Sequence, residues 1–154
     1  MYDMETTKIE EIEVTFGLLN RTNWRCTTPG PWDKEPDLLK FDIYEYQCLI
    51  IRSNTTGALN GYIGVPQTHP WHNQSSEDLN LVLDIHGGIT HISTEVYKIS
   101  VPYGGRWVGF DCSHSFDFMP AISVPTQHDS YRDIWFVMHE CISLAGQARL
   151  PAEK

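Results

Sequence analysis

The fold is decided by residues 39–65, LKFDIYEYQCLIIRSNTTGALNGYIGV. Apolar and polar residues partly alternate over residues 39–46, and residues 48–51 form a continuous apolar run, which is typical of a buried strand. The turn-forming residues 54–57 separate this run from a second strand-like segment, residues 59–65. The stretch therefore predicts an antiparallel β-hairpin in the middle of the chain.

The segments before this hairpin are less regular. Apolar residues recur at helical spacing over residues 9–19, behind a capping box of Thr7 and Glu10, which favours a short helix. The alternation over residues 12–18 fits a strand nearly as well. Residues 20–37 are rich in Thr, Pro, Gly and Trp, and this composition predicts an irregular arm.

The segments after the hairpin complete the predicted fold. We expect a polar loop over residues 67–79 and two further strands over residues 81–86 and 106–112. Residues 130–148 carry apolar side chains on one helical face. The sequence therefore predicts an α+β fold, in which a small, mostly antiparallel sheet has a C-terminal helix packed on one face and an irregular N-terminal arm.

The length and composition fit a single domain, residues 1–154, with a helix or strand plus the irregular arm in residues 1–36 and the main body in residues 37–148. The 11 Lys and Arg residues are outnumbered by 20 Asp and Glu residues, and a net charge of -9 argues against duplex nucleic acid as a partner. The chain has neither a secretory signal at its N-terminus nor an apolar run of membrane length, so we expect a cytoplasmic protein with no membrane partner. Four well-separated cysteines are expected to stay reduced, and self-association into a homo-oligomer stays open.

One candidate site segment is His86-Gly87-Gly88, at the end of an apolar run. Glycines there let the backbone turn sharply and admit a ligand closely, so Gly87 and Gly88 are candidate ligand-binding residues. The same dipeptide also fits a β-bulge or a tight strand exit, with His86 merely hydrogen-bonded at the rim.

The second candidate segment contains Asp111, His114 and Asp117, which are spaced three apart. Where the chain coils, all three side chains can converge, and His86 and His91 could complete a site for a divalent metal such as Zn, Mn or Mg. Alternatively, His114 is a general base oriented by Asp111 or Asp117, with Cys112 or Ser113 as a more distant candidate for the nucleophile. A third interpretation is purely structural, with Asp111 capping the turn, His114 packing and Asp117 facing water. Both chemical interpretations require this segment to lie beside His86 in space.

Three further residues are candidates for ligand binding. Trp107 could stack on a base or sugar ring, although such aromatics more often belong to the core. Tyr131 and Arg132, at the start of the C-terminal helix, could present a guanidinium to an anion, but a surface salt bridge to Asp129 or Asp133 is equally ordinary for Arg132. Arg106 is a second candidate for an anion.

Several of these blocks occur together in a fixed order, namely Gly30-Pro31-Trp32, residues 61–66, His86-Gly87-Gly88-Ile89-Thr90, residues 107–114 and Tyr131-Arg132-Asp133. In this order they resemble a family of small uncharacterised proteins encoded mainly by bacteriophages and prophages, with HGG(I/L)T and W-x-GFDC-x-H motifs, over about residues 28–148. The resemblance implies a phage accessory protein in the cytoplasm of the host cell.

The chain departs from this family at two positions. Phe116 stands where the family usually has a small residue, often glycine, before the aspartate, which questions a tight turn at Asp117. Asn60 stands where the family often has cysteine, so a thiol there is not essential.

These observations leave three functional hypotheses. The first is a phage accessory protein that binds a small polar, nucleotide-like ligand beside His86, Trp107, Asp111 and His114, with counter-defence as one setting. The second is a metal-dependent hydrolase in which His86, Asp111, His114 and Asp117 are metal ligands or catalytic acid–base groups. The third is an acidic protein-interaction module whose surface mimics nucleic acid.

Overall fold

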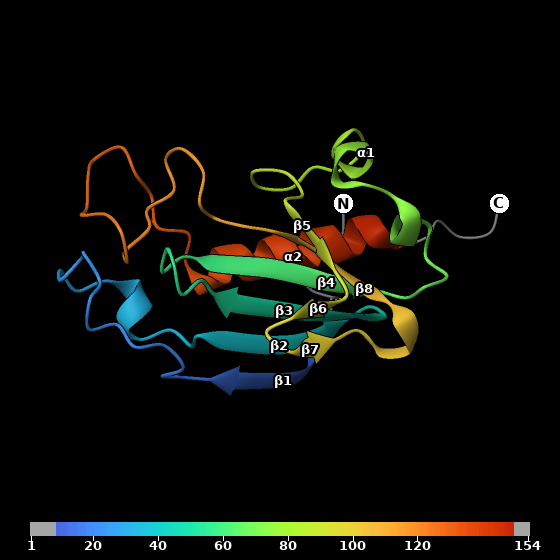
Figure 1. Ribbon diagram of the computed structural model, residues 1–154, viewed down its shortest axis with the longest axis horizontal. Coiled ribbons are helices and arrows are strands. Elements are labelled where there is room, and N and C mark those ends of the chain that lie inside the picture. Colours follow the sequence, from blue (N-terminus) through green and yellow to red (C-terminus); the bar gives the residue numbers. More distant parts are fainter. Residues whose placement is uncertain (1–8, 150–154) are drawn as a thin grey trace.

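The computed structural model of the chain describes residues 9–149 (Figure 1). Its main feature is a six-stranded sheet in the order β1-β2-β3-β4-β8-β5, in which all neighbouring strands are antiparallel. The strands are β1 (Ile9–Thr15), β2 (Leu38–Ile43), β3 (Tyr46–Arg52), β4 (Leu59–Val65), β5 (His91–Ser93) and β8 (Arg106–Phe110). The helix α2 (Ile134–Ala148) lies along one face of this sheet, which confirms the predicted α+β fold.

Shorter elements connect these strands. A small hairpin of β6 (Glu95–Val96) and β7 (Ile99–Ser100) forms a second sheet, and α1 (Ser76–Asn80) precedes the His86 loop. Three 3-10 helices cover Pro31–Asp33, Pro70–Asn73 and Pro102–Gly104. None of the helices within residues 9–149 is long and apolar enough to cross a membrane.

The predicted central hairpin is confirmed as β3 and β4, with Cys48 opposite Ile63. Gly61 of β4 lies where the sheet meets α2, opposite Phe110 of β8. A Cβ atom at Gly61 would lie 2.6 Å from the Phe110 ring and 2.7 Å from Cys141 Sγ. The glycine therefore allows the ring and the helix thiol to pack directly on the strand.

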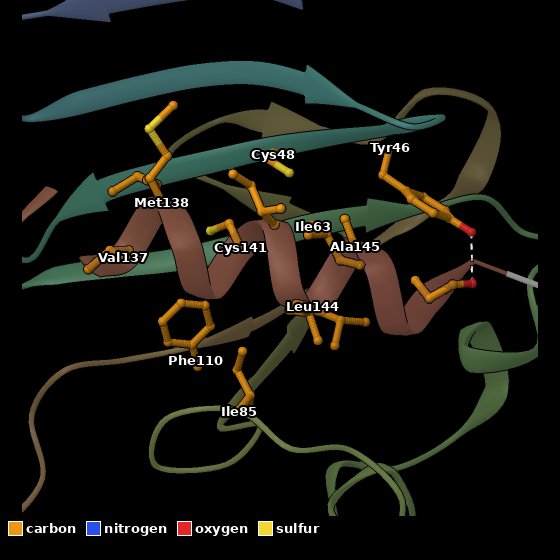
Figure 2. Packing of buried hydrophobic residues seen from close by; sticks show 14 of the residues in the cluster. Tyr46, Cys48, Ile63, Ile85, Phe110, Val137, Met138, Cys141, Leu144 and Ala145 are labelled. Atoms are coloured by element: carbon orange, nitrogen blue, oxygen red, sulfur yellow. Dashed lines mark hydrogen bonds between the residues drawn. The ribbon is translucent and has the colours of Figure 1, made fainter. Parts of the chain in front are cut away.

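Alternation along the strands gives the sheet two apolar faces, and both are covered. Figure 2 shows the side chains of α2, among them Cys141 and Ala145, packed against Cys48 and Ile63 of the sheet. The opposite face buries Leu38, Leu49, Ile51, Tyr62 and Trp107 against Val96 of the β6–β7 hairpin. Each fully buried apolar side chain contributes about 1.5–3 kcal/mol, so the two faces together hold the sheet in place.

Of the two alternatives for the first element the strand is observed, and one predicted strand is wrong. Residues 9–15 form the edge strand β1 rather than the favoured helix, because pairing of Val14 with Leu39 and its neighbours outweighs the helical spacing; Thr7 of the predicted capping box lies outside the described residues. Residues 81–86 form no strand. The backbone N–H groups of residues 81–83 donate back to carbonyls of residues 78 and 79, so this segment continues from α1 as turns.

The C-terminal helix begins later than predicted, at Ile134 instead of residue 130. Asp133 has an extended backbone, and its carboxylate accepts a hydrogen bond from the backbone N–H of Phe136. This is the geometry of an N-cap, so the helix starts at the next residue. Residues 130–132 lie outside the helix, and Arg132 contacts Asp117 in the turn that follows β8.

Candidate metal centre

The loop that carries His86 is held by side chains from α1 and α2. Gly87 and Gly88 have φ values of 69° and 80°, a left-handed backbone that glycine adopts without strain. Asn80 closes the loop, since its side-chain oxygen accepts from Ile89 N at 2.6 Å and its amide donates to Ile89 O at 3.0 Å. The backbone N–H of His86 donates to Glu140 Oε1 of α2 at 2.7 Å, which holds the backbone of His86 beside the helix.

The segment after β8 folds into a tight turn. Asp117 N donates to His114 O at 2.9 Å, and Asp111 Oδ1 accepts from Ser113 N at 3.1 Å. Phe116 has a φ of 73°, so this turn takes the left-handed backbone for which glycine is better suited. The turn directs Asp117 inward, where it is almost fully buried.

His86, His114 and Asp117 converge. The two imidazole centroids lie 6.0 Å apart, and His86 Nε2 lies 2.9 Å and 3.0 Å from the two carboxylate oxygens of Asp117. One ligand atom from each residue lies within 4.8 Å of the other two. The double-glycine loop and the turn after β8 are therefore neighbours, as the sequence-based hypotheses required.

Gly87 is part of this convergence. A Cβ atom on it would lie 2.2 Å from Cε1 of the His114 ring. Only a residue without a side chain lets the His114 imidazole lie this close to the loop. The glycine thus sets the distance between the two histidines.

Asp117 is held as an anion by several donors. Burial alone would raise the pKa of Asp117, but hydrogen bonds from Arg132 Nε at 2.8 Å, from the backbone N–H of His114 at 3.0 Å and from His86 outweigh it, and the pKa lies below its usual value. The carboxylate therefore stays charged at neutral pH. Its orientation is fixed on both oxygens by hydrogen-bond donors, as is common for carboxylates that bind metals.

The Nδ1 atom of His114 is shielded from solvent and has no hydrogen-bond partner among residues 9–149. It lies 3.3 Å from Asp111 Oδ1 and 3.5 Å from Asp117 Oδ2, without the geometry of a hydrogen bond to either. Buried polar atoms are rarely left unpaired, and a bound water or ion can supply the contact that such an atom lacks. This nitrogen lies close to two carboxylates, an arrangement that favours binding of a cation.

Asp111 lies beside the cluster but is outside the set of three. Its Oδ2 accepts from Thr90 Oγ1 at 3.0 Å, and its carboxylate is partly exposed. It can therefore orient His114 or exchange a proton with solvent. His91 does not join the cluster, because its ring packs edge-on against Tyr62 at 5.1 Å and its Nε2 contacts Ser93 Oγ.

Two candidate ligand-binding residues use their polar groups within the fold. Trp107 is 0% exposed on the sheet face opposite α2, and its indole N–H donates to Ile99 O at 2.8 Å. The Tyr131 hydroxyl is tied to Arg52 and Glu35. The proposed roles of Trp107 and Tyr131 therefore need correction: both are structural, because the β6–β7 hairpin covers the first and the N-terminal arm packs on the second.

Other candidate groups are also committed to the fold. Cys112 is buried, and burial raises the pKa of its thiol, so it does not supply a thiolate nucleophile. Arg106 donates through Nη2 to the carbonyls of Trp71 and Gln74 rather than to an anion. Gly88 faces the side chain of Asn80. The four cysteines are free, as predicted.

The sequence did not identify the residues that support the site. Glu140 and Phe136 project from α2 toward His86, with the Phe136 ring perpendicular to the His86 ring at a centroid distance of 5.1 Å. Their spacing of four residues places both on one helical face, which was the available signal. A separate buried network of Glu35, Asp37 and Arg52 was missed as well.

Comparison with known proteins adds no relative, since the chain matches no protein-family model, no curated protein and no solved structure. The functional argument therefore rests on the geometry of the site.

Proposed function

We propose that His86, His114 and Asp117 bind a divalent metal ion and that the protein is a metal-dependent hydrolase. The observation that carries this proposal is the convergence of three ligand atoms within 4.8 Å, together with the unpaired, solvent-shielded Nδ1 of His114. Two imidazoles and one carboxylate are donors that suit zinc and manganese. Three protein ligands are also the number found in catalytic zinc sites, where the remaining position is left to water or substrate.

A metal ion in this position would supply a nucleophile, because it lowers the pKa of a bound water to near neutrality. In the hydrolysis, the water oxygen forms a bond to the electrophilic carbon or phosphorus of the substrate, and the bond to the leaving group breaks. The proton lost by the water passes to a base and from there to the leaving group. Asp111 is suited to that role, since it is partly exposed and lies 3.3 Å from His114 Nδ1.

The biological setting is part of the same proposal. The resemblance to phage and prophage proteins supports an accessory protein that acts in the cytoplasm of the host cell on a small polar, nucleotide-like molecule. Counter-defence against a host nucleotide signal is one such role. The acidity of the chain, with a net charge of -9, supports a small ligand over duplex nucleic acid.

The metal site is tested on the full chain purified without chelator. We expect about one zinc or manganese ion per chain by elemental mass spectrometry, and zinc affinity at least tenfold weaker in His114→Ala, measured by competition with a chromogenic chelator. His128→Ala is the matched control, because His128 is exposed and remote from the cluster in its contacts. Equal zinc affinity in the wild type and His114→Ala would contradict the proposal.

Hydrolysis is tested separately on the same samples. The metal-loaded protein is expected to cleave p-nitrophenyl phosphate, a phosphate monoester, and a chelator or the His114→Ala substitution should abolish the reaction. Turnover that survives both treatments would show that the cluster is not the catalytic site.

A further inference from the structure

Arg132 lies against the candidate metal centre with part of its guanidinium unused. Its Nε donates to Asp117 Oδ1 at 2.8 Å, and its guanidinium carbon lies 5.1 Å from the centroid of the Phe136 ring. These two contacts fix the plane of the group. Its two terminal nitrogens make no hydrogen bond with any residue of the described part of the chain, and the side chain is 26% exposed.

The fully buried arginine of the core, Arg52, differs in this respect. Arg52 is fully buried and uses its donors on Asp37, Glu35, Tyr131 and two backbone carbonyls. Each nitrogen of the Arg52 guanidinium thus donates a hydrogen bond within the fold. Arg132 instead has two terminal nitrogens without a hydrogen bond to the described residues, on a side chain that is partly exposed.

The free donors of Arg132 are adjacent to the proposed metal position. Asp117 Oδ1, which accepts from Arg132, also lies 2.9 Å from His86 Nε2. The guanidinium and a candidate metal ligand therefore meet at one carboxylate oxygen. A substrate group bound to a metal between His86 and His114 would lie within reach of the guanidinium.

We infer that the substrate of this site is a phosphate monoester whose phosphoryl group is shared between the metal and Arg132; this inference rests on the proposed metal site. A guanidinium pairs with two oxygens of a phosphate in a planar, bidentate contact. The metal requires a third oxygen. The phosphoryl group of a monoester offers three oxygens besides the ester bond, whereas a diester and a carboxylate each offer two, so the combination selects a phosphate monoester.

The reaction that follows is hydrolysis of the ester. The oxygen of the attacking water bonds to phosphorus, the bond between phosphorus and the leaving oxygen breaks, and the leaving oxygen takes up the proton. Arg132 and the metal would both stabilise the charge on the phosphoryl oxygens during this step. No oxidant or further co-reactant is needed.

The first experiment measures inorganic phosphate binding to the zinc-loaded full chain by calorimetry, with acetate as the carboxylate probe. We expect phosphate to bind at least tenfold more tightly than acetate, and Arg132→Gln to weaken phosphate binding at least tenfold while zinc binding is retained. Arg25→Gln is the matched control, since Arg25 is exposed and makes only a backbone contact, with Ala121. Unchanged phosphate affinity in Arg132→Gln, or acetate binding as tight as phosphate binding, overturns the inference.

A second measurement needs no substitution and covers the case in which Arg132→Gln disturbs Asp117. Phenylglyoxal labels accessible arginines, and peptide mass spectrometry gives the rate at each one. Phosphate should slow the labelling of Arg132 in the zinc-loaded chain and leave Arg25 unaffected. Equal labelling of Arg132 with and without phosphate overturns the inference, whereas a wild-type chain that takes up no zinc overturns the proposed function itself.

Discussion

Phe116 combines an exposed ring with a left-handed backbone. Its side chain is 65% exposed, so it gains little from burial, and its φ is 73°. This conformation costs a non-glycine residue about 1–2 kcal/mol, against less than about 1 kcal/mol for the greater freedom of glycine in the unfolded chain. We predict that Phe116→Gly raises the free energy of unfolding by about 0.5–1 kcal/mol in urea denaturation.

Ser115→Gly provides the comparison for this prediction. Ser115 precedes Phe116 in the same turn and is exposed, but it is not among the residues with positive φ. Glycine there should lower stability by about 0.5–1 kcal/mol. If both substitutions lower the stability, the backbone of Phe116 is not under the strain that its φ implies.

Comparison of Gly87 with Gly17 separates two roles of glycine: adopting a positive φ and leaving space for a neighbouring side chain. Gly17 and Gly87 have nearly the same φ, 68° and 69°, but a Cβ atom at Gly17 would meet nothing within 4 Å, whereas at Gly87 it would collide with the His114 ring. We predict that Gly17→Ala and Gly87→Ala each lose about 1 kcal/mol of stability for the backbone. Only Gly87→Ala should also weaken zinc binding, by at least tenfold, because the His114 imidazole must move away.

Urea denaturation without metal and chelator competition with zinc measure the two effects separately. Zinc affinity in Gly87→Ala equal to that in Gly17→Ala would show that His114 does not have to lie against the loop. It would also remove His114 from the proposed ligand set.

At the residue scale, the sequence located His86, Asp111, His114 and Asp117 but could not rank their roles. Their residue types and spacing predicted a cluster, because a turn brings residues three apart together. The orientation of Asp117 by Arg132 depends on a contact from the segment that precedes α2, 15 residues further along the chain. Spacing along the chain contains no information on contacts of that range.

At the scale of elements, the apolar run over residues 81–86 shows why a strand was expected where none exists. The run has strand-like composition, but Leu81 is 83% exposed and Val82 is 72% exposed, whereas Leu79 and Ile85 are buried. Two consecutive exposed residues, with one buried residue before them and one after, do not follow the two-residue alternation of a strand. The pattern of burial, rather than the apolar composition, distinguishes a strand from the turns that residues 81–86 form.

Substitutions can distinguish these structures in solution. We predict that Leu81→Ser changes the free energy of unfolding by less than about 0.5 kcal/mol, because the side chain is exposed. Leu79→Ala should cost about 2–5 kcal/mol, since Leu79 is fully buried in the core under α2. A large loss in Leu81→Ser would instead indicate that residues 81–86 pack as the predicted strand.

At the scale of the whole molecule, the sequence predicted one covered sheet face, but the sheet has two. The helix α2 was recognised from its periodicity, and it covers Phe110. The β6–β7 hairpin is too short and too polar to be recognised, yet Val96 covers Trp107 on the other face. The sequence therefore allowed Trp107 to stack on a ligand, whereas in the structure its side chain is buried and cannot do so.

A buried ionic network joins the N-terminal arm, the sheet and α2. Arg52 at the end of β3 donates through Nε to Asp37 Oδ1 at 2.8 Å, and its Nη2 contacts Glu35. Glu35 Oε2 accepts from Ile134 N at the start of α2, and Asp37 also accepts from Arg21. Parts that are far apart in the sequence thus depend on charges that must stay paired, because removing one partner of a buried pair leaves an uncompensated charge.

This network sets how the fold responds to acid. Burial alone would raise the pKa of Asp37, but hydrogen bonds from Arg52 and Arg21 outweigh it, and the pKa in the folded protein lies below its ordinary value. A carboxylate with a lowered pKa stabilises the fold above its unfolded pKa of about 4, and this contribution is lost as the pH falls from there through the folded pKa.

We predict that Asp37→Asn lowers the free energy of unfolding by about 3–5 kcal/mol at neutral pH and flattens its decline below about pH 4. Urea denaturation across this pH range measures both effects, and Asp84→Asn, at an exposed carboxylate, should stay within about 0.5 kcal/mol of the wild type with an unchanged acid decline. An acid decline as steep in Asp37→Asn as in the wild type would assign the acid sensitivity of the fold to carboxylates outside this network.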